Sequence, residues 1–187
     1  MGDFGTGAFV HHHFSFRAAA LALACLAPLW AAPAQAQDFT TEPRIATVVQ
    51  LALPALAGIC AARQGRTGDF LAGFAAETLT VQGLKHRLGD VPLNRRPNGG
   101  PYGFPSGHAA LAMYGATSLA RKCAPDRPLI AALAYGAALA VAVSRVHSRN
   151  HNAGQVLSGL AIGHFANGVS LGVVPRGGLA LGFSMSF

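Results

Sequence analysis

The residues best suited to chemistry lie in one short stretch, residues 103–108 (GFPSGH), which runs directly into the charge-free segment 109–120. A Pro-Ser-Gly turn before an apolar run is typical of a helix start, with Ser106 as the N-cap and Gly107 permitting close approach. The first amides of a helix are unpaired, and the helix dipole favours an anion there. Because His108 falls in the first turn, the stretch predicts an anion site with a proton donor beside it.

Candidate partners for this anion lie on both sides of the stretch. Lys85 and Arg96 precede it, and Arg145, His151 and Gln155 follow it. A guanidinium group binds two oxygens of a phosphate at once, which an ammonium group does not. Phosphate-ester hydrolysis needs charge neutralisation, an in-line nucleophile and a proton for the departing oxygen. The residue types present supply all three.

The order of these groups is Lys then Arg-Pro, Pro-Ser-Gly-His, and Ser-Arg followed after five residues by His. This order resembles the type 2 phosphatidic acid phosphatase superfamily, which includes bacterial acid phosphatases and vanadium haloperoxidases. The resemblance covers roughly residues 66–174. It implies that His151 attacks phosphorus to form a phosphohistidine, that His108 protonates the leaving group, and that no metal or other cofactor is required. It also implies a set of phosphate-binding residues, namely Lys85, Arg96, Ser106, Gly107 and Arg145.

The first motif departs from the family pattern. That pattern has six residues between the Lys and the Arg-Pro pair, which leads to Gly89 in this chain. Ten residues separate Lys85 from Arg96 instead, so the loop must absorb four extra residues, and Arg87 is an alternative to Lys85.

The third motif departs at the residue expected to orient the nucleophile. The family has Asp four residues after the reactive His, and this chain has Gln155 there, with no Asp or Glu after Asp126. An amide oxygen fixes a histidine tautomer but brings no charge. Asp69 and Glu77, on the second expected helix, are alternative partners for the ring. We expect reduced but real turnover, and two other readings stay open: a phosphate-binding protein without catalysis, and a vanadate-dependent haloperoxidase.

The charge distribution and the N-terminal segment indicate where the protein acts. The formal net charge is +7 over 187 residues, and many cations lie close to the motifs, with no aromatic-spaced basic stripe. This favours a phosphorylated substrate over nucleic acid, and leaves an anionic membrane open as a partner.

Residues 1–36 read as a cleaved signal peptide, because Arg17 precedes the apolar run 18–30 and Ala34-Gln35-Ala36 is a small-x-small site. We expect export to the periplasm or inner membrane of a bacterial envelope.

The hydrophobic pattern predicts an all-α bundle of about five core helices with a short C-terminal β-hairpin. The helical domain is expected over residues 37–174 and the terminal strand over 175–187. A loop rich in Pro, Gly and Asn is expected over 89–103. The expected helices are 45–62, 67–85, 106–121, 129–143 and 152–167, and the expected hairpin strands are 169–174 and 179–187.

Two further features bear on the environment of the protein. Cys60 and Cys123 form a disulfide after export or remain two buried thiols, and the sequence is compatible with both. The charge-free runs 45–62 and 129–143 are marginal in length for a membrane span. The apolar composition favours a lipid phosphate as the substrate. The sequence does not indicate an oligomeric state.

Overall fold

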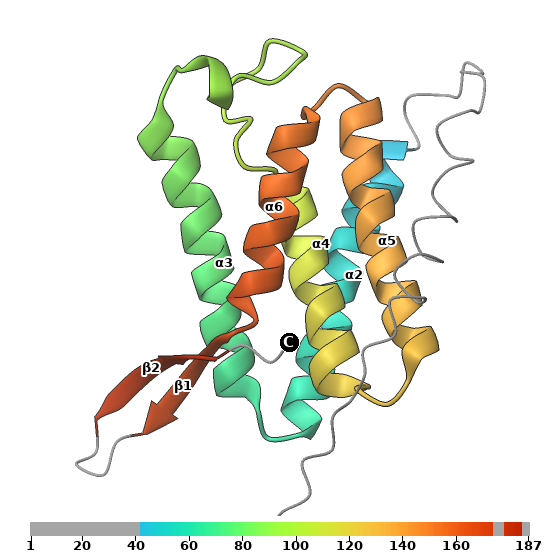
Figure 1. The fold of residues 1–187 in the computed structure, drawn as a ribbon, viewed down its shortest axis with the longest axis vertical. Helices are drawn as coiled ribbons and strands as arrows, with labels where there is room; N and C mark the ends of the chain where they lie inside the picture. Colours follow the sequence, from blue (N-terminus) through green and yellow to red (C-terminus); the bar gives the residue numbers. More distant parts are fainter. Residues whose placement is uncertain (1–41, 174–177, 185–187) are drawn as a thin grey trace, which may run out of the picture. The chain divides into compact units, whose positions relative to one another are not determined.

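The computed structural model describes residues 42–173 and 178–184, and this part of the chain contains five α-helices and one β-hairpin (Figure 1). The predicted helical bundle with a C-terminal hairpin is therefore confirmed. The expected signal peptide, the hairpin turn at 174–177 and the last three residues lie outside the described residues. The helices are α2 (Glu42–Arg63), α3 (Thr67–Leu88), α4 (Gly107–Ser118), α5 (Pro128–His147) and α6 (Ala153–Ala166).

The helix ends follow local sequence signals. Ser106 caps α4, and its side chain accepts a hydrogen bond from the Ala109 amide. Asn152 caps α6 in a capping box with Gln155, and Pro128 begins α5, where its missing N–H costs nothing. The expected helix 106–121 ends earlier, at Ser118, and continues as the π-helical segment η3 (Leu119–Cys123).

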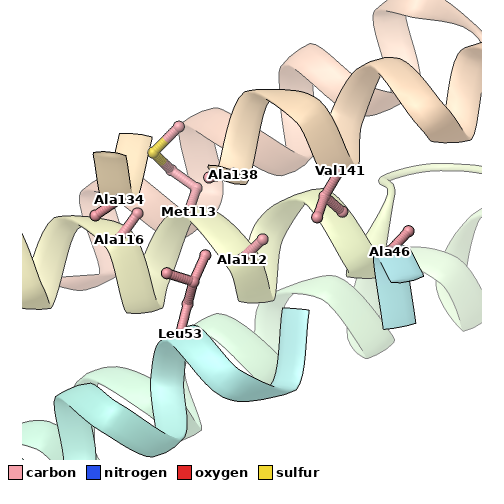
Figure 2. Close-up of a cluster of buried hydrophobic side chains, with 8 residues drawn as sticks. All are labelled: Ala46, Leu53, Ala112, Met113, Ala116, Ala134, Ala138 and Val141. Carbon is pink, nitrogen blue, oxygen red and sulfur yellow. The ribbon is translucent and has the colours of Figure 1, made fainter. Parts of the chain in front are cut away.

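Helix α4 lies at the centre of the bundle and packs against the other four helices. Most of its buried side chains are small, which allows neighbouring backbones to approach closely, and Met113 and Tyr114 are the large exceptions. One cluster of the core joins α4 to α2 and α5, and Figure 2 shows its side chains meeting between these helices. The cluster consists of Ala46, Leu53, Ala112, Met113, Ala116, Ala134, Ala138 and Val141.

Two connections that carry sequence motifs emerge at the same end of the helices (Figure 1). The first is the loop between α3 and α4, which contains the 3₁₀ turn η2 (Pro92–Asn94). The second is the short turn between α5 and α6. The antiparallel alternation of the helices places these distant segments together, and this end of the bundle carries the candidate site.

The opposite end carries the hairpin and a disulfide. Strands β1 (Val169–Val173) and β2 (Leu179–Phe183) pair antiparallel, with Leu171 opposite Leu181. Cys60 at the end of α2 is bonded to Cys123 in η3, so the disulfide alternative is the one that the structure adopts. Because such bonds persist in oxidising compartments, this agrees with an exported protein.

Within residues 42–173 and 178–184, two helices are long and apolar enough to cross a membrane: residues 44–63 of α2 and residues 128–147, which form α5. Both present large apolar side chains to the surface. On α2 these include Ile45, Val48, Leu51, Leu56 and Ile59, and on α5 they include Leu129, Leu133 and Val143.

Glycines permit the close approach of α6 to α4. A Cβ atom added at Gly163 would overlap the Ala110 carbonyl oxygen and lie 2.9 Å from the Tyr114 backbone nitrogen. Gly159 faces the Ser106 carbonyl oxygen in the same way. Both glycines therefore lie where α6 contacts α4 closely, whereas Gly154 lies on the exposed side of the helix.

We therefore predict that Gly163→Ala lowers the free energy of unfolding by about 2 kcal/mol or more, because the two backbones must separate to admit the methyl group. Gly136→Ala on α5 is the matched control, since a Cβ there meets nothing within 4 Å. Helix propensity alone should make the control more stable by ~0.5–1 kcal/mol. Denaturant unfolding of both variants tests the prediction, and equal stability of the two would contradict it.

Candidate active site

A cavity of about 350 Å³ at the loop-bearing end brings together five of the predicted site residues. These are Lys85 from α3, Arg96 from the α3–α4 loop, Gly107 and His108 from the start of α4, and His151 from the α5–α6 turn. The rest of the wall is mixed in polarity and includes Gln50, Phe74, Glu77, Thr78, Val81, Gln82 and Leu111.

His151 is 3% exposed, and its tautomer follows from its partners. Its Nδ1 lies 2.8 Å from the Gly103 carbonyl oxygen and 3.3 Å from Oε1 of Gln155. Because a carbonyl oxygen only accepts hydrogen bonds, Nδ1 carries the proton and donates it. Nε2 of the neutral ring therefore holds a free lone pair, which is the state that a histidine nucleophile requires.

Gln155 is fully buried, and both ends of its amide are bonded. Its Nε2 donates to the carbonyl oxygens of Leu93 (3.0 Å) and Arg95 (2.8 Å). Its Oε1 then faces His151 and accepts from the Asn152 amide at 3.1 Å. The amide thus orients the histidine ring and joins the α3–α4 loop to α6.

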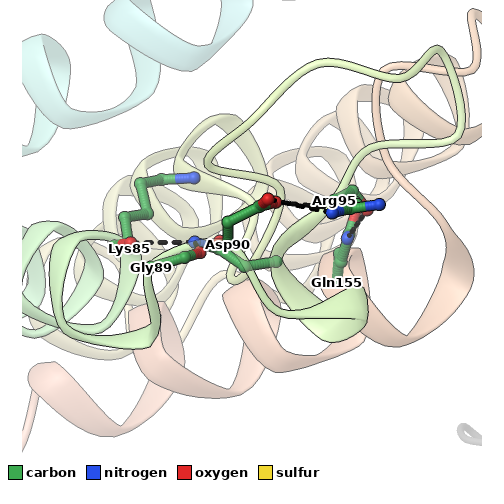
Figure 3. A network of polar contacts seen from close by, with 6 residues as sticks. Lys85, Gly89, Asp90, Arg95 and Gln155 are labelled. Atoms are coloured by element: carbon green, nitrogen blue, oxygen red, sulfur yellow. Dashed lines mark hydrogen bonds and ion pairs between the residues drawn. The ribbon is translucent and has the colours of Figure 1, made fainter.

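Asn94, which is 1% exposed, organises the same loop from within. Its Nδ2 donates to the carbonyl oxygens of Lys85 (2.9 Å) and Gly89 (2.8 Å), and its Oδ1 accepts from the Phe104 amide (3.0 Å). Figure 3 shows Lys85 and Gly89 near the end of α3, beside the contact between Gln155 and Arg95. The loop between α3 and α4 is therefore held by two buried amide side chains, those of Asn94 and Gln155.

The cations of the site are poorly neutralised by protein groups. Lys85 is 8% exposed, and its Nζ donates to the Tyr102 carbonyl oxygen at 2.6 Å. Burial, and then the nearby Arg96, lower its pKa to about 8. The Nε atoms of Arg96 and Arg145 are buried and have no hydrogen-bond partner among the described residues. Buried donors of this kind are costly unless an anion accepts from them.

The two histidines have unusually low pKa values. Burial is the largest cause at both and lowers each pKa to about 4. The positive charges of Arg145, Arg96 and Lys85 lower the pKa of His108 further. At His151 the carbonyl of Gly103 partly offsets these effects, because it accepts a hydrogen bond from the ring. Both rings are therefore neutral near pH 7 when no anion is bound.

Other candidates from the sequence lie elsewhere or play a different part. Arg87 is exposed, so Lys85 rather than Arg87 lines the cavity. Ser106 is fully buried and caps α4 rather than lining the wall. Its backbone amide donates to the backbone carbonyl oxygen of Gln155 at 2.8 Å. Asp69 does not reach the ring of His151, because its Oδ1 accepts from the Leu171 amide instead.

Two contributing residues, Gly103 and Asn94, were given no role from the sequence, and a third, Glu77, lies at the site in a different role from the expected one. Gly103 supplies the carbonyl that fixes the tautomer of His151, and a Cβ there would lie 2.5 Å from Nε2 of Gln155. Asn94 has no sequence signal beyond the usual presence of Asn in loops. Glu77 was considered only as a partner for the ring, but it shares the cavity wall, where burial raises its pKa to about 7.

Comparison with known proteins identifies the family. The profile of the PAP2 superfamily matches residues 66–176, which is more than half of the chain. The chain belongs to the PAP2 superfamily. Membership indicates a phosphatase-type hydrolase, and the matched residues contain the whole cavity except Gln50. No curated protein and no solved structure matches the chain.

The contacts of Gln155 predict the effect of restoring a negative charge. We expect Gln155→Glu to be destabilised by ~2–4 kcal/mol, because a carboxylate oxygen would face the carbonyl oxygens of Leu93 and Arg95 with no proton between them. Thermal or denaturant unfolding measures this effect, and Gln64→Glu on the exposed surface is the control. A Gln155→Glu protein that is as stable as wild type and hydrolyses phosphate esters faster would contradict the assigned amide orientation.

Proposed function

We propose that this PAP2 protein is a metal-independent phosphatase that hydrolyses a phosphomonoester or a pyrophosphate through a phosphohistidine on His151. The single observation that carries the proposal is the donation from Nδ1 of His151 to the Gly103 carbonyl. It leaves the lone pair of Nε2 available in the same cavity as Lys85, Arg96 and His108.

In the proposed first step, Nε2 of His151 attacks phosphorus and the bond from phosphorus to the leaving oxygen breaks. Lys85, Arg96 and Arg145 neutralise the phosphate oxygens, together with amides at the start of α4. His108 gives its proton to the departing oxygen. In the second step, neutral His108 takes a proton from water, whose oxygen attacks phosphorus. The bond between phosphorus and Nε2 then breaks and inorganic phosphate leaves.

A neutral Gln155 is compatible with this chemistry. The Gly103 carbonyl and the Gln155 amide oxygen both accept from Nδ1, so the ring is held in the reactive tautomer by two dipoles. Neither dipole stabilises a ring cation as strongly as a carboxylate does. We therefore propose a working enzyme with a lower rate than one with Asp at this position.

A phosphorylated lipid is the proposed substrate class, and the proposed location is the periplasmic side of a bacterial inner membrane. The two apolar helices with exposed Leu, Ile and Val side chains support membrane association. The bond between Cys60 and Cys123 supports export, because it needs an oxidising compartment.

The decisive experiment is to trap the phosphoenzyme. Wild-type protein that is mixed with a ³²P-labelled lipid phosphate and quenched in alkali should carry acid-labile label, and His151→Ala should carry none. His151→Ala should also lose activity by ~10³-fold or more, because the nucleophile is absent. His147→Ala is the control, since His147 is exposed on α5. Phosphate binding without label in wild type would favour the non-catalytic alternative.

The low pKa of His108 predicts a particular pH dependence. A bound phosphate offsets the charges of Lys85, Arg96 and Arg145, so it favours the protonated ring and raises the pKa of His108 from about 4. The falling alkaline limb of kcat should therefore lie at higher pH than that of kcat/KM, once substrate ionisation is subtracted. His108→Ala should lack this limb. Coincident limbs would count against His108 as the proton donor.

A further inference from the structure

A second cavity, of about 420 Å³, lies at the opposite end of the helices, near the disulfide and the hairpin. We call it the distal cavity. It shares no residue with the candidate active-site cavity (below, the catalytic cavity). Its lining residues come from the start of α3, the segment η3, the end of α6, strand β1 and the residue after β2. Figure 1 shows that these elements lie together at the hairpin end of the helices. The residues that line it are Arg66, Asp69, Arg121, Lys122, His164, Asn167, Gly168, Val169, Ser170 and Ser184.

Positive charge dominates the lining of the distal cavity. Arg66, Arg121 and Lys122 come from two elements and converge on it, and Asp69 is the one acid among its lining residues. The Asp69 carboxylate is already engaged: Oδ1 accepts from the Leu171 amide at 3.0 Å, and Oδ2 lies 4.0 Å from Nε of Arg66. The cavity therefore keeps an excess of cations that its own carboxylate does not balance.

These cations are close enough to repel one another. Burial is the largest cause that lowers the pKa of Lys122, and the charge of Arg66 lowers it further. Asp69 raises this pKa by less than Arg66 lowers it, and Arg121 adds the smallest lowering effect. Burial and Arg121 lower the pKa of His164 in the same way. Repulsion between partly buried cations destabilises the fold unless an anion binds between them.

The local backbone also favours an anion here. Arg66 precedes α3 without a capping side-chain hydrogen bond, so the first amides of a 22-residue helix lack that partner. Arg121 and Lys122 lie on the π-helical segment, a rare geometry that is frequent at functional sites. The bond from Cys123 to Cys60 ties this segment to α2, which restricts the movement of both cations.

Apolar surface adjoins the distal cavity. A groove of about 300 Å³ between α3 and α6 shares Val169 with it and is otherwise lined largely by apolar side chains, including Phe165 and Phe183. Phe165 is 50% exposed, and on the hairpin Phe183 is 64% and Leu181 is 74% exposed. A cationic cavity beside an exposed apolar surface matches the two parts of an anionic phospholipid.

We propose that the distal cavity is a second anion site, which binds a phosphate-bearing group independently of the catalytic cavity. The phosphate oxygens accept hydrogen bonds from Arg121, Lys122 and Arg66, and His164 lies at the edge of the bound group. A phospholipid headgroup and free inorganic phosphate share this chemistry. The apolar groove provides room for an acyl chain only if the ligand is a lipid.

The test uses the full-length protein in detergent and follows the ring signal of His164 by ¹H–¹⁵N NMR, which separates this cavity from His108 and His151. The probes are inorganic phosphate, dihexanoyl-phosphatidylglycerol and dihexanoyl-phosphatidylcholine. An anion in the cavity raises the pKa of His164 toward its ordinary value. We expect this shift with phosphatidylglycerol and not with phosphatidylcholine, whose choline cation offsets its phosphate. A response to inorganic phosphate at equal or lower concentration would identify the ligand as free phosphate.

The variant for this test is Arg121→Gln/Lys122→Gln, and the matched control is Arg63→Gln/Arg127→Gln, whose cations are exposed and do not line the cavity. The first pair of substitutions should raise the dissociation constant of the probe roughly tenfold or more, while leaving phosphatase activity unchanged. It should also raise the melting temperature without probe, because it removes repulsion. The proposal is overturned if no probe shifts His164, or if both pairs respond as wild type does. Phosphoenzyme trapping on His151 tests the other cavity. The proposed phosphatase function and the proposed distal anion site can therefore each be rejected without the other.

Discussion

The buried amide of Gln155 is the contact on which the arrangement of the catalytic cavity depends. It joins two parts of the chain that are distant in sequence: the loop that carries Arg96, and the turn with His151 together with the helix that follows it. Each of its hydrogen bonds is modest by itself, but a buried amide with all its partners in place defines one geometry. A carboxylate at this position would accept a hydrogen bond from the histidine ring, but it could not donate hydrogen bonds to the carbonyl oxygens of the loop.

The presence of an amide in place of a carboxylate also bears on the longer segment between Lys85 and Arg96. The loop between Lys85 and Arg96 is four residues longer than the family pattern allows, and its carbonyl oxygens need donors where it crosses α6. Only an amide provides donors to the loop and an acceptor to His151 at the same time. Gln155, which replaces the carboxylate of the family pattern, thus contacts both the longer segment and His151.

Uncompensated positive charge occurs at both ends of the helices. At the candidate active site, Lys85, Arg96 and the neighbouring Arg145 have no carboxylate partner among the described residues, and two guanidinium Nε atoms there are buried without an acceptor. In the distal cavity, Arg121 and Lys122 lie near a single carboxylate, that of Asp69, which already accepts a hydrogen bond from the Leu171 amide. Binding of an anion would relieve the electrostatic cost in either cavity, and the two cavities share no lining residue.

The sequence by itself determined the helices, the hairpin and the set of chemically important residues. Caps such as Ser106 and Asn152 act within one turn, and apolar periodicity acts within one helix, so both are legible in the local order of residues. The tertiary structure alone decided which carbonyl fixes the tautomer of His151, that Lys85 rather than Arg87 lines the cavity, and that Cys60 bonds to Cys123. It also decided that cations on α3 and η3 share one cavity with His164 on α6. These outcomes depend on distances between segments that lie far apart along the chain, and those distances are set by how α4 packs against its neighbours.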